Sequence, residues 1–192
     1  MKVNEIFYSL QGEGFHTGTP AVFLRLSGCN LRCPFCDTRH ESGEEMTESE
    51  IVDRICAFPT RTIVITGGEP SLFLTETLVD ALHRKGRKVN VETNGTHRLP
   101  DNVDWVTLSP KDAFTEHAIP VMQRYDELKV VYDGRKMPDE YRQFDIKHRF
   151  LQPCDVGDEA KNREIIRETI EYIKQNPQWR LSLQTHKFLD IP

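Results

Sequence analysis

Short β-rich runs alternate with amphipathic helical patterns along most of the chain. Six runs dense in Val, Ile and Leu predict strands, and Leu181–Gln184 is a possible seventh. The six are Ala21–Ser27, Thr62–Thr66, Lys88–Glu92, Trp105–Ser109, Glu127–Tyr132 and His148–Gln152. Apolar strands that alternate with helices are typical of an α/β protein whose mostly parallel sheet is covered by helices.

Three segments carry apolar residues at helical spacing, namely Thr47–Phe58, Leu72–Lys85 and Lys161–Asn176. Thr47 and Glu50 fit a capping box at the start of the first helix, and Gly86 fits the end of the second. About six βα units are too few for a closed barrel of eight. We therefore expect an open, partial TIM-like barrel, built as a single domain over residues 1–192, with its site at the C-terminal ends of the strands.

Composition narrows the classes of function. The 192 residues carry a net charge of -5, which argues against nucleic acid as the main partner. No apolar run approaches the length of a membrane span, so we expect no membrane partner and a cytoplasmic location. The cysteines number five, which is odd, and three are clustered, which indicates metal binding in a reducing compartment rather than a disulfide framework.

The clustered cysteines are Cys29, Cys33 and Cys36, spaced C-x3-C-x2-C. Three thiolates can bind three irons of a cubane cluster and leave the fourth iron open to a small molecule, here S-adenosylmethionine. His40 follows at a spacing that would also allow a Cys3His zinc site, and the spacing alone leaves both readings open. Phe35 could be a core residue or could present its ring to adenine.

Polar or glycine-rich turns follow five of the predicted strands and would share one rim of the sheet. They are the cysteine loop, Gly67–Pro70 (GGEP), Glu92–Thr96 (ETNGT), Ser109–Lys111 (SPK) and Gln152–Asp155 (QPCD). The two glycines of GGEP allow close backbone approach, and no P-loop lysine follows them. This turn suits the ammonium of an amino acid better than a phosphate.

The cysteine motif followed one βα unit later by GGEP resembles the radical S-adenosylmethionine superfamily. In that superfamily a [4Fe–4S] cluster reduces bound S-adenosylmethionine, and the resulting radical abstracts a hydrogen atom. The resemblance implies that Cys29, Cys33 and Cys36 hold the cluster. It also implies cofactor contacts from Phe35, Cys36, Asp37, Gly67, Gly68, Glu69, Gly95, Ser109, Pro110, Lys111, Gln152, Pro153, Cys154 and Asp155.

Within that superfamily, four N-terminal runs resemble the family of 7-carboxy-7-deazaguanine synthases. They are EIFYSLQGEG at 5–14, GTP at 18–20, FLRLSGC at 23–29 and CDT at 36–38. The resemblance covers nearly the whole chain, although Ala113–Arg124 matches no motif. It implies conversion of 6-carboxy-5,6,7,8-tetrahydropterin to 7-carboxy-7-deazaguanine and ammonia in queuosine biosynthesis. A flavodoxin or ferredoxin as electron donor and a homodimer are implied in the same way.

Several residues suit such a substrate. Arg25 could bind its carboxylate through two hydrogen bonds, or be a surface arginine. Leu10, Gln11 and Gly12 could offer backbone groups to the pterin edge, or form a simple turn. Thr93 could reach a polar edge of the substrate or cap its strand. The sequence alone favours a helix cap for Thr38, whereas the resemblance makes its hydroxyl a Mg²⁺ ligand.

The chain ends without a polar tail. Phe188, Leu189 and Ile191 are apolar enough to pin this end against the body, whereas most termini fray. In the pinned arrangement His186 and the carboxylate of Pro192 would close the active site and face the pterin. The resemblance favours that arrangement.

Two other functions share some of these features. An activating enzyme that makes a glycyl radical on a protein partner would share the cysteine loop and GGEP, and a zinc-binding structural protein would use Cys3His. The remaining candidates are expected outside the site: Cys56 in the core, the acidic run Glu41–Glu50 as a solvated face, and His83, His97, His117 and His148 at the surface or in structural positions. Cys154 could face the cofactor or merely pack.

Overall fold

The computed structural model describes the chain except for residues 39, 122–123, 136–140 and 142–145. Its strands form one nine-stranded sheet in the order β3-β1-β2-β4-β5-β6-β7-β8-β9. The bounds are β1 Lys2–Leu10, β2 Pro20–Leu26, β3 Glu44–Glu45, β4 Thr62–Gly67, β5 Lys88–Thr93, β6 Trp105–Leu108, β7 Glu127–Tyr132, β8 His148–Pro153 and β9 Arg180–Leu181. All neighbours from β2 to β9 are parallel, and the two edge strands do not pair with each other. The open, partial barrel is confirmed.

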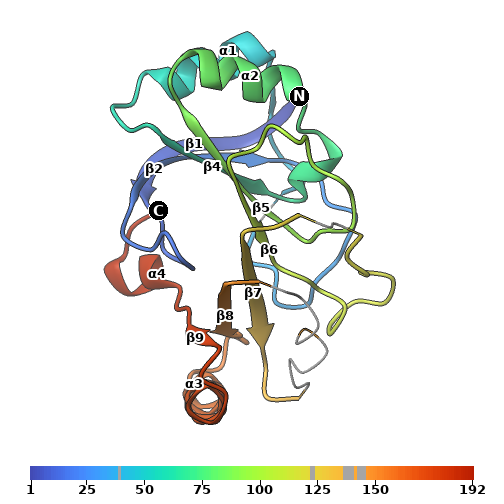
Figure 1. Cartoon of the computed structure of the whole chain (residues 1–192), viewed down its shortest axis with the longest axis vertical. Coiled ribbons are helices and arrows are strands. Elements are labelled where there is room, and N and C mark those ends of the chain that lie inside the picture. The colour runs from blue at the N-terminus through green and yellow to red at the C-terminus, as the bar shows by residue number, and fades with distance from the viewer. Residues whose placement is uncertain (39, 122–123, 136–140, 142–145) are drawn as a thin grey trace.

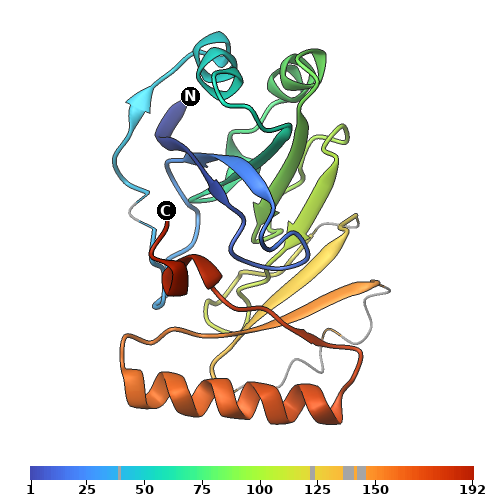
Figure 2. The same cartoon turned by 90° about the vertical axis from the view of Figure 1, so that its left-hand side faces the viewer.

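Three of the four α-helices in the described residues pack at the two ends of this sheet (Figures 1 and 2). Helices α1 (Glu48–Cys56) and α2 (Glu76–Arg84) lie together at one end, and α3 (Glu159–Gln175) runs beside β8 and β9 at the other. The described residues between β5 and β7 form no helix. Among the described residues, no helix has the length and apolar character needed to cross a membrane.

Local chemistry sets the helix bounds. The Thr47–Glu50 capping box is present at α1. Helix α2 begins at Glu76 rather than near Leu72, because Pro70–Leu72 forms a separate 3-10 turn and the Thr75 side chain accepts from Leu78 N at 3.2 Å. Gly86 follows α2 with a φ of 71°, a backbone conformation that favours glycine.

The core has two main parts, one at each end of the sheet. Ile51, Ile63 and Leu78 belong to the part between α1, α2 and the first parallel strands. Leu151 and Trp179 belong to the part between β7, β8 and α3. Helices pack on both ends of the sheet and bury its side chains. The loops at the carboxyl ends of the strands are therefore presented by a packed frame.

Strand β1 was not predicted from the sequence. It runs antiparallel to β2 with a register shift between Val3 and Glu5, and this irregularity breaks the alternation that would reveal it. The rings of Phe7 and Phe23 stack across the pair at 4.9 Å. Because the pair is antiparallel and Leu10 lies opposite Pro20, the LQGEG run starts beside the amino end of β2.

Candidate active site

A cavity of about 590 Å³ opens at the carboxyl ends of the strands. Its lining comes from β1, β2, the cysteine loop, the turns after β4, β5, β6 and β8, and the C-terminus. Of the site residues predicted from the sequence, all but Gly95 and Pro110 line it. Segments from both ends of the chain thus meet in one place.

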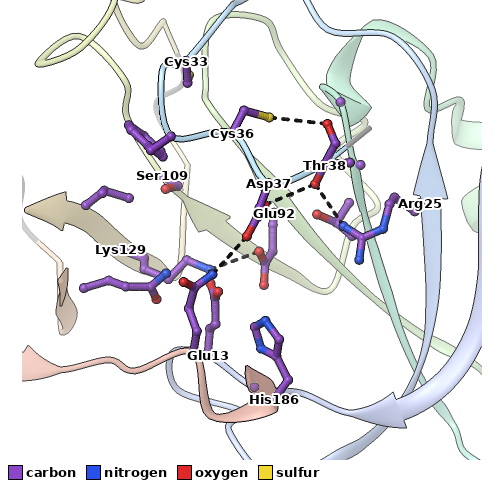
Figure 3. Close-up of a pocket in the computed structure, with 18 of the residues that line it drawn as sticks. Glu13, Arg25, Cys33, Cys36, Asp37, Thr38, Glu92, Ser109, Lys129 and His186 are labelled. Carbon is purple, nitrogen blue, oxygen red and sulfur yellow. Dashed lines mark hydrogen bonds and ion pairs between the residues drawn. The ribbon is translucent and has the colours of Figure 1, made fainter. Parts of the chain in front are cut away.

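The cysteine loop forms one wall of the cavity (Figure 3). None of the three thiols is in a disulfide, and all three also line a second hollow of about 560 Å³ on the other side of the loop. Burial raises the pKa of the Cys29 and Cys33 thiols, and the charge of a bound metal would favour their thiolate forms.

The three cysteine thiols fit the ligand set of a cubane. Among the described residues, no three His, Cys, Asp or Glu side chains converge in the arrangement that holds one metal ion. A cubane takes each thiolate on a different iron, so its cysteines need not converge on one point. His40 lines the second hollow and not the cavity, and its backbone carbonyl accepts a hydrogen bond from Gly28 N at 2.8 Å.

The GGEP turn packs directly on the cysteine loop. A Cβ added at Gly68 would lie 1.8 Å from Gly28 O, so only glycine allows this approach. The Glu69 carboxylate is buried and accepts from the amides of Ser71 at 2.9 Å and Asn94 at 2.7 Å. Glu69 therefore ties the turn after β4 to the turn after β5.

Thr93 serves the same anchor. Its hydroxyl donates to Glu69 Oε1 at 2.5 Å and accepts from Gly95 N at 3.0 Å. These two bonds give the hydroxyl the local, strand-end role, and Thr93 also lines the cavity, so its contact with a substrate stays a prediction. Thr66, which the sequence analysis did not single out, lines the cavity and lies in register with Arg25 on the neighbouring strand.

Arg25 on β2 faces the cavity within a fixed frame. Its Nε donates to Glu5 Oε1 at 2.7 Å, and its Nη1 donates to Thr38 Oγ1 at 3.2 Å. The guanidinium carbon lies 5.6 Å from the centroid of the Phe7 ring. These contacts hold the guanidinium beside Thr38, so one anionic group could reach both.

The backbone of the LQG run is mostly engaged within the protein. Gln11 N donates to Thr19 O at 2.8 Å, and Gln11 O accepts from Gly18 N at 2.7 Å. Gly12 O accepts from both the amide and the hydroxyl of Thr185, at 3.0 and 2.8 Å. These hydrogen bonds hold the loop and the C-terminal segment together, and a contact of this run with the substrate stays a prediction.

The C-terminal helix α4 (Thr185–Leu189) reaches the cavity through polar contacts. Gln184 Nε2 donates to Asp37 Oδ2 at 3.3 Å, and Lys187 Nζ donates to Asp155 Oδ2 at 2.8 Å. The prediction that apolar side chains pin this end is wrong for Phe188 and Leu189, which are 71% and 59% exposed. Hydrogen bonds to the two neighbouring turns hold the segment instead.

The last two residues expected in the site both reach it. His186 lines the cavity with its ring against Gly12, where an added Cβ would lie 2.2 Å from Nδ1. Pro192 also lines the cavity, which places the terminal carboxylate close to the opening. In both views of the fold, α4 turns back toward β1 and β2 (Figures 1 and 2).

The turns after β6 and β8 supply the remaining predicted cofactor residues. Lys111 Nζ donates to the carbonyl and the hydroxyl of Ser109, each at 2.6 Å, and burial lowers the pKa of Lys111. Cys154 is buried, and that burial raises the pKa of its thiol to about 11, so the thiol is neutral. Hydrogen bonding to Lys187 is the main cause that lowers the pKa of Asp155 to about 2.

Sequence reasoning assigned no site role to five charged residues that line the cavity, and three of them, Glu13, Glu92 and Lys129, form one group (Figure 3); the other two are Glu5 and Lys187. Lys129 Nζ pairs with a carboxylate oxygen of Glu13 and lies 3.1 Å from Glu92 Oε2. Burial alone would raise the pKa of Glu13, but the adjacent Lys129 outweighs it and lowers that pKa. The available signal was a lysine in the middle of an apolar strand, which indicates an inward-facing charge.

The histidines and Cys56 that were expected outside the site lie outside the cavity. His83 Nε2 lies 2.8 Å from Asp104 Oδ2 away from the cavity, and His148 packs against Phe15 with ring centroids 4.3 Å apart. Cys56 packs against the core beneath α1. None of these side chains lines the cavity.

Comparisons with known proteins identify the family. The Radical SAM superfamily profile matches residues 24–134. The chain is 50% identical over 190 residues to a 7-carboxy-7-deazaguanine synthase of Bacteroides thetaiotaomicron, covering 99% of this chain and 98% of that protein. A synthase of the same name from Nitratidesulfovibrio vulgaris is 40% identical over 217 residues, covering 100% and 99%. The crystal structure of QueE from Escherichia coli superposes with a TM-score of 0.76 at 28% identity, covering 95% of this chain and 92% of that one. The chain therefore belongs to the 7-carboxy-7-deazaguanine synthase family of the radical SAM superfamily and is an enzyme.

Proposed function

We propose that this enzyme converts 6-carboxy-5,6,7,8-tetrahydropterin to 7-carboxy-7-deazaguanine and ammonia, a step of queuosine biosynthesis. The observation that carries the proposal is the single cavity in which the cysteine loop, the GGEP turn and Arg25 meet. A cluster site and a cationic site for a carboxylate in one cavity suit a radical enzyme whose substrate is a small carboxylate. The 50% identity to a synthase of this name across 99% of the chain gives independent support.

The cofactors have a clear place in this cavity. Cys29, Cys33 and Cys36 would hold a [4Fe–4S] cluster, and the turns after β4, β6 and β8 would hold S-adenosylmethionine beside it. When bound, this pair supplies the electron and the hydrogen-atom abstraction on which the reaction depends. The protein's part is to hold the cofactor's amino-acid end against the GGEP backbone and to keep the pterin within reach.

The carboxylate end of the substrate would lie at Arg25 and Thr38. We propose that Thr38 also holds Mg²⁺, because its hydroxyl is a hard oxygen donor beside the cation that would bind the same carboxylate. Mg²⁺ keeps much of its water shell and binds readily through one or two protein or substrate oxygens. Thr66, in register with Arg25, completes this polar corner.

The opposite end of the substrate would face the C-terminal segment. His186 and the Pro192 carboxylate line the cavity, and a carboxylate is a good acceptor for the paired N–H groups of an aminopyrimidinone. We propose that this segment closes the site as part of one domain over residues 1–192. Its polar contacts to Gly12, Asp37 and Asp155 support that role.

The partners follow from the same chemistry. The cluster requires a one-electron donor of low potential, for which a flavodoxin or ferredoxin is suitable. We also propose a cytoplasmic location, because unpaired cluster thiols require reducing conditions, and a homodimer by analogy with the family. A protein-activating enzyme and a zinc-binding structural protein are less well supported, since neither explains the identity to synthases along the whole chain.

Turnover tests the proposal directly. The protein is reconstituted with iron and sulfide under anaerobic conditions and incubated with the carboxytetrahydropterin, S-adenosylmethionine, Mg²⁺ and a low-potential reductant. We expect one 7-carboxy-7-deazaguanine and one ammonia for each pterin consumed, only when all components are present. A protein that binds S-adenosylmethionine but leaves the pterin unchanged would contradict the proposal.

A further inference from the structure

The most unusual buried group in the cavity is the ammonium of Lys129. Lys129 lies in the middle of β7, and its side chain is only 4% exposed. Its ammonium pairs with Glu13 and Glu92, which belong to two other segments of the chain (Figure 3). A buried lysine without partners would lose its charge. Burial works against the charge here too, but Glu13, Glu92 and Glu127 outweigh it and raise the pKa of Lys129.

The two carboxylates that Lys129 joins are themselves part of a wider frame. Gln11 Nε2 donates to Glu92 Oε1 at 2.9 Å, and Gln11 Oε1 accepts from Glu13 N at 3.2 Å. Glu13 lies in the loop after β1, and Glu92 lies in β5, so the contacts join elements far apart in sequence. All four side chains line the cavity.

The formal charges of Glu13, Glu92 and Lys129 determine which kind of ligand this group can bind. Two carboxylates held near each other without a cation would share a proton, and one of them would then donate instead of accept a hydrogen bond. One ammonium between two carboxylates leaves a formal charge of -1 on the group of three. Such a surface favours a neutral ligand that is rich in N–H donors and disfavours a second anion.

We propose that Lys129 is a positioning residue, which holds Glu13 and Glu92 as two hydrogen-bond acceptors aimed into the cavity for the N–H groups of the pterin. The proposal rests on the proposed function, because it concerns the binding of that substrate. Lys129 acts on the substrate through the two carboxylates, and it takes no part in the cluster or in the contacts of the GGEP turn.

The test uses Lys129→Met in the reconstituted, cluster-loaded enzyme, because methionine keeps an unbranched side chain and removes the charge. We expect KM for the pterin to rise about 10- to 100-fold, from the loss of one or two hydrogen bonds to charged acceptors. The iron content and the slow cleavage of S-adenosylmethionine in the absence of pterin should stay at the wild-type level. The matched control is Lys174→Met, which removes an exposed lysine paired with Glu171 on α3 and should change none of these values.

A second variant separates positioning from folding. In Lys129→Met the buried carboxylate of Glu13 loses its cation, which destabilises the fold. The double variant Lys129→Met/Glu13→Gln removes that unpaired charge and should recover thermal stability, while KM for the pterin stays high. If Lys129→Met does not fold, the double variant carries the KM measurement. Lys129→Arg should recover part of the substrate affinity, since it keeps the charge in a larger group.

Three results would overturn the inference. A KM within twofold of wild type in Lys129→Met would show that the pterin does not depend on the two carboxylates. Equal losses of cluster, cofactor cleavage and turnover would show a general structural role. Wild-type enzyme that cleaves S-adenosylmethionine but never converts the pterin would contradict the proposed function itself, and the inference would fall with it.

Discussion

Removal of the Arg25 guanidinium should weaken substrate binding by a predictable amount. The side chain is 25% exposed, and two of its donors are already used, at 2.7 Å on Glu5 and at 3.2 Å on Thr38. Breaking a buried, hydrogen-bonded charge pair costs about 2–5 kcal/mol. Partial exposure and the compensating charge of Glu5, which is 50% exposed, place Arg25→Ala at the lower end, about 2–3 kcal/mol.

That free energy corresponds to a rise of about 30- to 150-fold in KM for the pterin. Initial rates over a range of pterin concentrations, with saturating S-adenosylmethionine and Mg²⁺, give KM and kcat separately. Arg25→Lys should recover only part of the loss, because an ammonium cannot present two parallel N–H donors to a carboxylate. The control is Arg54→Ala on α1, which breaks an exposed ion pair of 2.9 Å between Arg54 and Glu44. Wild-type kcat/KM in Arg25→Ala would refute the reasoning.

Four further predictions follow from the site and its surroundings. Alanine at any one of the three clustered cysteines should abolish the cluster and turnover, whereas Cys56→Ala should keep both, as iron analysis and absorption spectra would show; loss of the cluster in Cys56→Ala would make the ligand assignment wrong. Turnover should rise with Mg²⁺, and Thr38→Ala should weaken that dependence in a metal titration; an unchanged titration would remove Thr38 from the metal site. A tag extending the chain past Pro192 should raise KM for the pterin strongly and leave S-adenosylmethionine binding intact, as kinetics and calorimetry would show; unaltered kinetics would exclude the terminal carboxylate from the site. Burial raises the pKa of Glu127 from 4.5 to about 6, so the folded protein binds this proton more tightly than the unfolded chain and loses stability as the pH rises through that window; Glu127→Gln should remove about 1 kcal/mol of the stability loss that denaturation measures between pH 5 and pH 7.5, and identical pH dependence in both proteins would contradict the assignment.

The parallel strands could be predicted from the sequence because their signal is local. Runs such as Glu127–Tyr132 are dense in β-branched residues and end at polar turns, and β7 has these same bounds in the structure. Strand β1 escaped prediction because a register shift interrupts its alternation. The start of α2 was placed too early because Pro70 and its neighbours form a 3-10 turn, which a helical pattern does not distinguish.

The site was predictable where its residues form compact motifs and not where they meet only through the fold. The cysteine loop and GGEP are short sequences with a recognisable chemistry, and both line the cavity. The group of Glu13, Glu92 and Lys129 joins three segments separated by up to 116 positions, so no sequence window contains it. For Thr93 the sequence offered both a substrate contact and a strand-end cap, and only the structure shows that its hydroxyl bonds to buried Glu69 from a segment 24 positions away.

The central claim is that three thiolates hold a cluster with one iron open toward the cavity. Electron paramagnetic resonance of the anaerobically reconstituted, reduced protein tests this most directly, with spectra recorded before and after addition of S-adenosylmethionine. We expect a brown protein with about four irons, and a cluster spectrum that changes on addition because the cofactor binds the iron that lacks a protein ligand. A colourless protein with one tightly held zinc ion, or a cluster spectrum that S-adenosylmethionine leaves unchanged, would contradict the account.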